Sequence, residues 1–235
     1  MSEWPNPDNS GINKVMTEAS LKVLYEDNHL IAVFKPAGVL VQGDISGDRC
    51  LMDDVREYLK IKYKKEGNVF LGLLHRLDRP VSGVVLFAKT SKGASRLSEQ
   101  IRDREFSKTY HAVVSGNIIP PRGELRDRIL KDDRDRIAII SNNGEEAVLD
   151  YETIKTGERN SLLRINLITG RFHQIRVQMS YRKNPIVGDI KYGSDTKLSN
   201  GQIALCATSI EFKKATEDEV VTVAIDYPKE WDKLM

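Results

Sequence analysis

Eight short apolar segments in this chain have the character of β-strands, and helices do not alternate with them regularly. The segments are residues 30–34, 84–88, 109–115, 137–140, 147–154, 162–168, 203–212 and 220–225. Several alternate apolar and polar side chains, which is typical of half-buried antiparallel strands. Three other segments, 51–65, 91–105 and 171–181, repeat apolar residues at helical spacing. The pattern predicts an α+β protein with a mixed, mainly antiparallel central sheet flanked by helices and loops, rather than a doubly wound fold.

The chain shows no internal division after its first residues. Residues 1–20 are polar and are expected to form an N-terminal arm, whereas residues 21–235 contain no repeat or linker and are expected to form one domain. The arm lacks the regions of a signal peptide, and no apolar run reaches the ~20 residues needed to span a bilayer. Cys50 and Cys206 cannot build a disulfide framework or a zinc site. We therefore expect a cytoplasmic protein with no membrane partner, most simply a monomer.

Charge is nearly balanced overall but is unevenly distributed along the chain. The 36 basic and 34 acidic residues leave a formal net charge of +2. Residues 159–191 contain seven bases and one acid, whereas residues 120–152 contain six bases and nine acids. The basic stretch is suited to a polyanion such as RNA, although charge alone fits a solvated surface equally well.

The most distinctive segment is residues 74–83, LHRLDRPVSG, which leads into the apolar segment 84–88. Its proline and glycine fix a loop rather than continuing a helix or a strand. A short, stiff loop before a buried strand can hold the carboxylate of Asp78 in a fixed position. Without further context, Asp78 could equally be a structural residue that caps a turn.

Five ordered motifs resemble those of RluA-type pseudouridine synthases. They are FKPAGVLV at 34–41, HRLDRPVSG at 75–83, KTY at 108–110, TGRFHQIRV at 169–177 and PIVGD at 185–189. The related RsuA-type enzymes usually have glycine where this chain has His75, so the resemblance favours the RluA branch. It runs from about Leu21 to Phe212 and implies a pseudouridine-synthase-like catalytic domain that isomerises uridine in ribosomal or transfer RNA.

The resemblance makes Asp78 the nucleophile and gives it two catalytic neighbours. A carboxylate can attack the anomeric carbon, or take its proton in a glycal route, without metal or cofactor; both routes stay open. Arg176 matches the arginine that pairs with this aspartate, and such a pair favours the ionised carboxylate. Tyr110 matches the tyrosine that stacks on the target base and is a candidate base for the proton on carbon 5. On bare sequence, Arg176 would be a structural ion pair or a phosphate contact, and Tyr110 a core residue.

Six further residues are expected to contact RNA or the target base. The target uridine must leave its stack to reach a buried aspartate, and we expect Arg76 to fill the vacated position or hold a phosphate. His75 could contact the RNA backbone, and a structural role is equally open to it. Leu205 matches an apolar position that packs under the base. The remaining candidates, for phosphate or structural contacts, are Lys35, Arg171 and His173.

The chain departs from the family pattern at four secondary positions. Val81 replaces threonine, and Phe34 stands where asparagine is common. Gln178 and Cys206 stand where histidine is common. These changes leave the expected nucleophile, arginine and tyrosine in place but weaken the transfer of neighbouring contacts. Only about 20 polar residues precede the first matched region, so RNA recognition is expected to rest on the catalytic domain or on a partner.

Three other functions compete with an RNA pseudouridine synthase. A non-catalytic RNA-binding protein on the same fold would need the basic stretch but not Asp78, Tyr110 and Arg176 together. A metal-dependent hydrolase is suggested by the acids between 132 and 135, but these alternate with arginines and have no histidine nearby, as in a solvated turn. An RNA or DNA glycosylase would also flip a base, and the release of free base would distinguish it.

Overall fold

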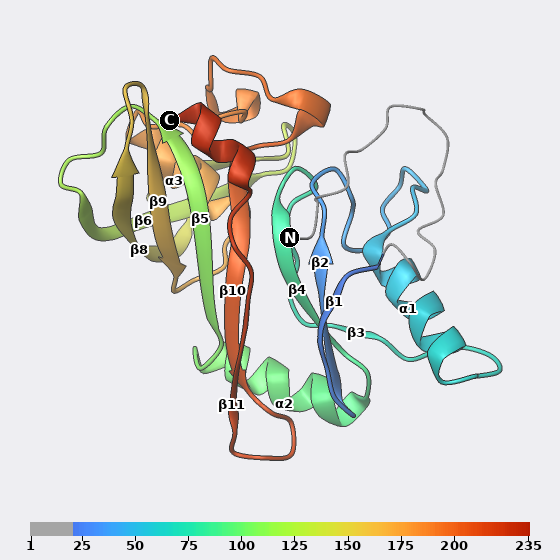
Figure 1. Cartoon of the computed structure of the whole chain (residues 1–235). Helices are drawn as coiled ribbons and strands as arrows, with labels where there is room; N and C mark the ends of the chain where they lie inside the picture. The colour runs from blue at the N-terminus through green and yellow to red at the C-terminus, as the bar shows by residue number, and fades with distance from the viewer. Residues whose placement is uncertain (1–20) are drawn as a thin grey trace.

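Strand β10, encoded near the end of the chain, occupies the centre of the sheet. The structure is a computed structural model that describes residues 21–235; the expected polar arm, residues 1–20, lies outside the described residues. β10 (Leu205–Lys213) runs parallel to β4 (Ser82–Ala88) on one side and antiparallel to β5 (Ser107–Ser115) on the other. Figure 1 shows β10, in orange-red, between the two green strands. The centre of the sheet therefore joins parts of the chain that are far apart in sequence.

The remaining strands extend the sheet on both sides of β10. Their order is β1-β2-β4-β10-β5-β9-β8-β6-β7, with β3 beside β4 and β11 beside β10. Only the β4–β10 pair is parallel among the strands of residues 21–235, so the predicted mixed, mainly antiparallel sheet and α+β class are confirmed. The bounds are β1 (Val23–Glu26), β2 (Leu30–Lys35), β3 (Gly72–Leu73), β6 (Arg122–Asp132), β7 (Ile137–Ile140), β8 (Glu145–Thr156), β9 (Asn160–Leu167), β11 (Val220–Ala224), α1 (Leu51–Lys62), α2 (Ser91–Arg102), α3 (Gln174–Tyr181), and the 3-10 helices η1 (Ile190–Tyr192), η2 (Ser199–Gly201) and η3 (Lys229–Leu234).

The close contact between β4 and β10 depends on a glycine. Gly83 pairs with Ala207 and has a φ of +134°, a conformation that side chains disfavour. A Cβ at Gly83 would lie 2.3 Å from the backbone oxygen of Ala207, too close for any side chain. The glycine that ends the HRLDRPVSG motif is therefore required where the two strands meet.

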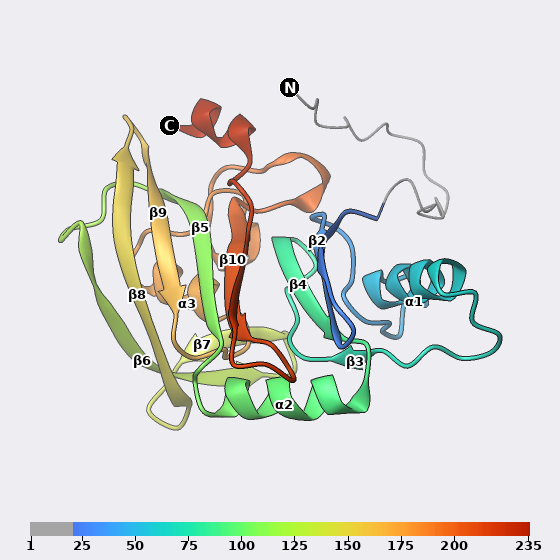
Figure 2. The same ribbon diagram turned by 60° about the horizontal axis from the view of Figure 1, so that its bottom comes forward.

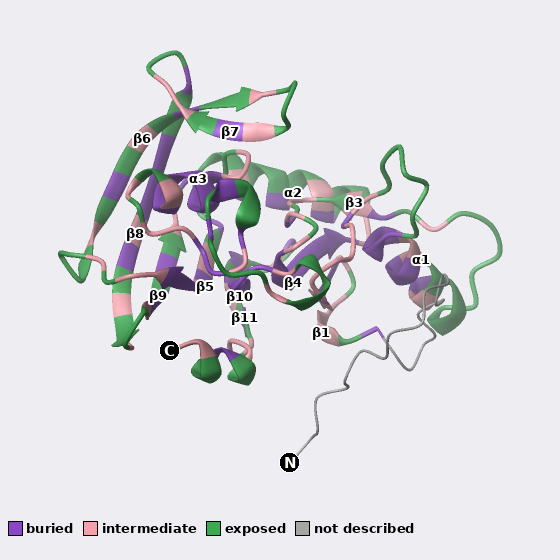
Figure 3. Ribbon diagram, turned by 90° about the horizontal axis from the view of Figure 1, so that it is seen from above, coloured by how far each residue is buried: buried purple, intermediate pink, exposed green. Residues whose placement is uncertain are grey.

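Both faces of the central strands are covered. Every residue of β4 is buried, and successive side chains point to opposite faces of the sheet. Val85 and Phe87 pack in one core cluster with α1, whereas Val84 and Leu86 pack in a second cluster with Leu97 of α2. Figure 2 shows α2 across the lower ends of β4 and β10, and α1 beyond β2 and β3. Figure 3 shows the contrast between the buried centre of the sheet and the mostly exposed β6.

All eight predicted strands and all three predicted helices are present, with shifted ends, and three strands were not predicted. β1 and β3 are short. β6 was missed because most of its residues are charged or exposed, and only Leu125 and Ile129 are buried. The acidic cluster after it forms the predicted exposed turn, residues 133–136. α3 begins at Gln174 rather than at 171, because His173 has a left-handed φ of 51° and forms the N-cap.

Candidate active site

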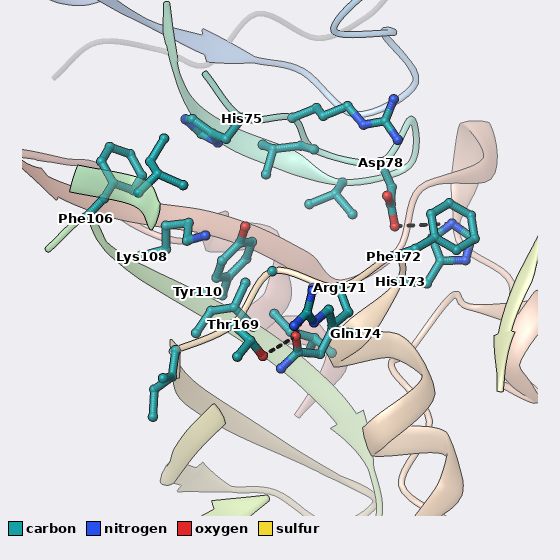
Figure 4. Close-up of a pocket in the computed structure, with 18 of the residues that line it drawn as sticks. His75, Asp78, Phe106, Lys108, Tyr110, Thr169, Arg171, Phe172, His173 and Gln174 are labelled. Atoms are coloured by element: carbon teal, nitrogen blue, oxygen red, sulfur yellow. Dashed lines mark hydrogen bonds and ion pairs between the residues drawn. The ribbon is translucent and has the colours of Figure 1, made fainter. Parts of the chain in front are cut away.

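A pocket of about 510 Å³ brings the three expected catalytic residues together. Its walls are the loop before β4, which carries Asp78, the start of β5, which carries Tyr110, and the segment from β9 into α3, which carries Arg176. In Figure 4 the Asp78 carboxylate points toward His173, and the Tyr110 hydroxyl points into the space beside it. Residues from three distant parts of the chain thus line one cavity.

The Arg176 guanidinium lies between two carboxylates. Its Nη1 donates to Oδ2 of Asp78 at 3.1 Å, while Nε and Nη2 bind the two oxygens of Asp189 at 2.7 and 2.8 Å. Arg176 and Asp189 are 5% and 1% exposed, whereas the Asp78 side chain is 28% exposed. Burial alone would lower the pKa of Arg176, but the two carboxylates raise it above its ordinary value. The guanidinium therefore stays charged and holds the more accessible carboxylate at the pocket.

The two oxygens of Asp78 differ in their contacts. Oδ2 lies 3.1 Å from Nη1 of Arg176 and 3.4 Å from Nε2 of His173. Oδ1 accepts no hydrogen bond from any residue in the described part of the chain. One oxygen is thus held by the protein and the other is left available to a ligand in the pocket.

Tyr110 and Leu205 form an apolar part of the pocket wall on adjacent strands. Tyr110 is 6% exposed and Leu205 3%, so each shows only a small surface to the pocket. Burial, with a further contribution from the nearby Asp78 charge, raises the pKa of Tyr110. Its hydroxyl therefore keeps its proton at neutral pH. In this state the tyrosine can stack on a ring or donate a hydrogen bond, and a role as proton acceptor would require that proton to leave first.

Lys35 does not line the pocket, which favours a structural role over the alternative of an RNA-phosphate contact. It is fully buried, and its Nζ donates to the carbonyl oxygens of Pro36, Val39 and Arg79 at 3.0, 2.8 and 3.2 Å. Burial lowers the pKa of Lys35 to about 7. Because its three donors are used, Lys35 has the structural role that was the alternative. It ties the loop after β2 to the loop that carries Asp78.

His75 is also positioned to serve the fold rather than an RNA backbone. Its Nε2 accepts a hydrogen bond from the backbone N–H of Leu86 at 3.0 Å. Its Nδ1 is buried and has no partner in residues 21–235. Burial lowers the pKa of His75 to about 3, so the ring is neutral. Of the two roles that the sequence left open, these contacts favour the structural one, in which the ring lies at the pocket wall with its centroid 5.4 Å from that of Phe106.

Three of the seven bases in the stretch 159–191 pair with acids of the stretch 120–152. Within it, Arg164 pairs with Glu152 and Arg182 with Asp127, at 2.5 and 2.8 Å. Arg171, at the pocket, pairs with Glu145 and also donates to the carbonyl of Glu146 at 2.9 Å. β8 lies beside β9 in the sheet, and β6 beside β8, which brings the two stretches together. Together with Arg176, which pairs with Asp78 and Asp189, four of the seven bases in this stretch are therefore not free cations, contrary to what its composition suggested.

The free cations at the pocket lie elsewhere. Arg76, Arg104 and Lys108 line it, and within residues 21–235 none of them has a carboxylate at ion-pair distance. Lys108 is half-buried with its Nζ 5.9 Å from the ring centroid of Phe106, and burial lowers the pKa of Lys108. Sequence reasoning selected Arg76 but missed the other two. Lys108, in the KTY motif, and Asp189, in the PIVGD motif, both lay inside recognised motifs. Nothing in the sequence indicated that Lys108 lines the pocket or that Asp189 binds Arg176.

Within residues 21–235, no group of three or more His, Cys, Asp or Glu side chains is placed to hold a metal ion. None of the helices in that range is both long enough and apolar enough to cross a bilayer.

Several known proteins resemble this chain. Residues 29–181 match the model of a family described as RNA pseudouridylate synthase. A ribosomal large subunit pseudouridine synthase D from Xanthomonas campestris pv. campestris is 32% identical over 234 residues, covering 92% of this chain and 68% of that protein. A tRNA pseudouridine synthase C from Vibrio vulnificus is 31% identical over 239 residues, covering 91% and 94%. The solved structure of human RNA pseudouridylate synthase domain containing 4 has a TM-score of 0.75 at 24% identity, covers 90% of both chains, and shows a shared fold.

Proposed function

The chain belongs to the RNA pseudouridylate synthase family, and on this premise we propose that it isomerises a uridine of ribosomal or transfer RNA with Asp78 as the nucleophile. The reaction breaks the bond between N1 of uracil and the ribose, and joins the ribose to C5 instead. The proton on C5 leaves, and N1 gains one. The proposed reaction uses no cofactor.

The single observation that carries this proposal is the asymmetric environment of Asp78. The buried Arg176 and the nearby His173 face Oδ2, while Oδ1 remains open to the pocket. A carboxylate with one oxygen held and the other open to a cavity can form a bond to the anomeric carbon or remove the neighbouring proton. Both routes need the same residue in the same charge state, so the proposal does not depend on the choice between them.

The depth of the site supports base flipping as part of this proposal. A stacked uridine cannot place its ribose against Asp78 while its base reaches Tyr110 and Leu205, which are almost completely buried. Extrusion costs a few kcal/mol if the base begins stacked. Stacking on Tyr110 and packing on Leu205 would offset part of that cost. Arg76, exposed at the rim with no protein partner among residues 21–235, is available to fill the vacated position.

RNA phosphates are assigned to the unpaired cations of the pocket. Lys108 and Arg104 lie on the side formed by β5 and the turn before it, and Arg76 lies on the loop of Asp78. A half-buried ammonium without a counter-ion is stabilised when an anionic ligand arrives. Arg171 remains a weaker candidate because Glu145 already neutralises it.

A non-catalytic RNA-binding protein is the competing function. It would use the same cations but would have no need for the Asp78–Arg176–Asp189 arrangement. The two functions differ in one measurable outcome, the formation of pseudouridine.

The test is pseudouridine mapping, by carbodiimide labelling and primer extension, on total RNA from cells with and without this protein. We expect one or more sites to vanish without the protein, to return with the wild-type chain, and to stay absent with Asp78→Asn. The matched control is Asp195→Asn, which changes an exposed aspartate outside the pocket and should restore the sites. Restoration by Asp78→Asn would refute the assignment of the nucleophile. If purified wild-type protein bound RNA but modified none of it, the binding function would be favoured.

A further inference from the structure

A line of polar contacts runs from β7 to the Asp78 carboxylate; its first two links are hydrogen bonds, and its last is a close approach of an imidazole nitrogen to a carboxylate oxygen. The backbone N–H of Ala138 donates to the Tyr192 hydroxyl at 2.6 Å. That hydroxyl lies 2.8 Å from Nδ1 of His173, and Nε2 of the same ring lies 3.4 Å from Oδ2 of Asp78. Tyr192 is 8% exposed and the His173 side chain 10%, so solvent has little access to either.

The direction of each hydrogen bond follows from the groups involved. A backbone N–H can only donate, so the Tyr192 oxygen accepts from Ala138. Its hydroxyl hydrogen then has one acceptor among the described residues, Nδ1 of His173. An imidazole that accepts at Nδ1 carries its proton on Nε2 when neutral, and Nε2 faces Asp78. The opposite tautomer would turn a lone pair toward a carboxylate.

The protonation states of both side chains agree with this arrangement. Burial lowers the pKa of His173 to about 3, with a smaller effect of the neighbouring Arg176 charge, so the ring is neutral near pH 7. Burial raises the pKa of Tyr192 to about 12, so its hydroxyl keeps the hydrogen that it donates.

The surrounding structure fixes both rings. The Tyr192 ring packs with Ala138 and Val177 in a small core cluster between the β6–β7 hairpin and α3. The Ser180 hydroxyl donates to the Tyr192 carbonyl at 2.6 Å. The His173 ring stacks on Phe172 with centroids 3.8 Å apart. As Figure 4 shows, the Asp78 carboxylate points at the held imidazole.

We propose that His173 and Tyr192 are positioning residues that hold Oδ2 of Asp78 and leave Oδ1 to react, which makes β7 part of the active site. This inference rests on the proposed role of Asp78 as the nucleophile. It changes the expected role of His173 from an RNA contact to a contact with the nucleophile. The positively charged guanidinium of Arg176 contacts Oδ2 from one side, and the His173 ring contacts the same oxygen from another. Two contacts from different directions stop the carboxylate from rotating.

The first test removes one hydroxyl. In Tyr192→Phe, His173 loses the donor that fixes its tautomer, so the single-turnover rate should fall about 10- to 100-fold while the Kd for RNA stays within about twofold. The matched control is Tyr151→Phe, which removes another buried tyrosine hydroxyl, one that donates to the Pro120 carbonyl at 3.0 Å away from the pocket. It should lose similar stability and keep its rate. Equal rates in the two variants would overturn the proposal.

The second test separates the effect of the backbone conformation at residue 173 from the effect of its side-chain N–H donor. Asn suits the left-handed φ of 51°, but its amide is too short to reach Asp78, whereas the longer Gln can place an N–H near the position of Nε2. We expect His173→Asn to lose the single-turnover rate and His173→Gln to recover part of it, at unchanged RNA affinity. A Gln variant no faster than the Asn variant, or an Asn variant with the wild-type rate, would contradict a donor role.

A third measurement is independent of turnover. Nitrogen-15 NMR of the histidine rings, without RNA, should find the His173 proton on Nε2 in the wild type and a shift toward Nδ1 in Tyr192→Phe. The tautomer unchanged in the variant, or on Nδ1 in the wild type, would refute the hydrogen-bond chain. Because RNA is absent, this result stands even if Asp78 proves not to be the nucleophile, so failure of the proposed reaction can be told from failure of this inference.

Discussion

Arg176 illustrates how one buried side chain can serve two acids with different tasks. Asp189 binds it through two hydrogen bonds and is almost fully buried, whereas Asp78 receives one bond and faces the pocket. The bidentate contact fixes the plane of the guanidinium. With that plane fixed, an N–H of Nη1 is directed at Asp78. Asp189 therefore controls the orientation of Asp78 although it does not itself line the pocket.

In Asp189→Asn, we expect the turnover rate to fall by more than the loss of stability alone would cause. The asparagine keeps the volume but leaves a buried guanidinium with one fewer counter-charge, so we expect a loss of about 2–4 kcal/mol in the free energy of unfolding. The single-turnover rate should fall at least tenfold, with RNA affinity within about twofold. Asp127→Asn is the control, since Asp127 pairs with Arg182 outside the pocket at 2.8 Å. An equal loss of rate in the control would deny Asp189 a specific role.

His173 also makes stability depend on pH. Burial lowers its pKa from 6.5 to about 3, so between these values the unfolded chain takes up a proton that the folded chain does not. Stability should therefore fall as the pH drops below about 6.5, with a slope of up to ~1.4 kcal/mol per pH unit for this group. Urea unfolding between pH 6.5 and about 4.5 measures how the free energy of unfolding changes with pH. In His173→Gln this dependence should become weaker, by an amount that corresponds to up to about one proton fewer taken up on unfolding. An unchanged slope would mean that His173 titrates alike in both states.

At the scale of secondary structure, predictability followed burial. β4 is buried along its whole length and was found from its apolar residues, and its preceding motif identified Asp78. β6 has only two buried side chains, Leu125 and Ile129, so it lacked the apolar alternation that marks a strand. Contacts between elements could not be predicted from the sequence. The charged residues of 159–191 could be counted, but which of them form ion pairs depends on which strands become neighbours in the sheet.

Gly83→Ala tests the closeness of β4 and β10. Backbone strain at a φ of +134° and overlap with Ala207 should together cost about 3–5 kcal/mol in the free energy of unfolding. Gly43→Ala is the matched control, because a Cβ there meets nothing within 4 Å and its φ lies outside the strained range. We expect its stability to change by less than about 0.5 kcal/mol. Urea midpoints that coincide for the two variants would show that the strands can separate without penalty.

At the scale of the whole molecule, pairing decides which charges RNA can use. A basic segment folded against an acidic one contributes little to a polyanion site, whereas three unpaired cations around one pocket can each displace a counter-ion. The small net charge of +2 is therefore compatible with local binding of RNA. It argues for recognition at the pocket over tight binding along a broad surface.

The dependence of RNA affinity on salt tests this view. In an Asp78→Asn background, replacing both Arg104 and Lys108 with Gln should reduce the slope of log Kd against log salt concentration by about two. Arg171→Gln should reduce it by less than one, because Glu145 already pairs with it. Arg96→Gln, which changes an arginine of α2 that pairs with Glu99 outside this pocket, is the control and should leave the slope unchanged. A larger effect from Arg171 than from the double variant would restore the basic stretch as the RNA site.

The position of β10 also has a consequence for how the chain is made. A ribosome releases β4 and β5 early, yet the strand that belongs between them is synthesised after every other strand except β11. Until it emerges, the nascent chain holds two incomplete sheets, each with an open edge that other polypeptides can join. The interval is long because β5 ends at Ser115, whereas β10 begins only at Leu205. Because Leu205 of β10 lines the pocket, the pocket can be complete only after β10 has been synthesised, and until then we expect the open edges to favour aggregation.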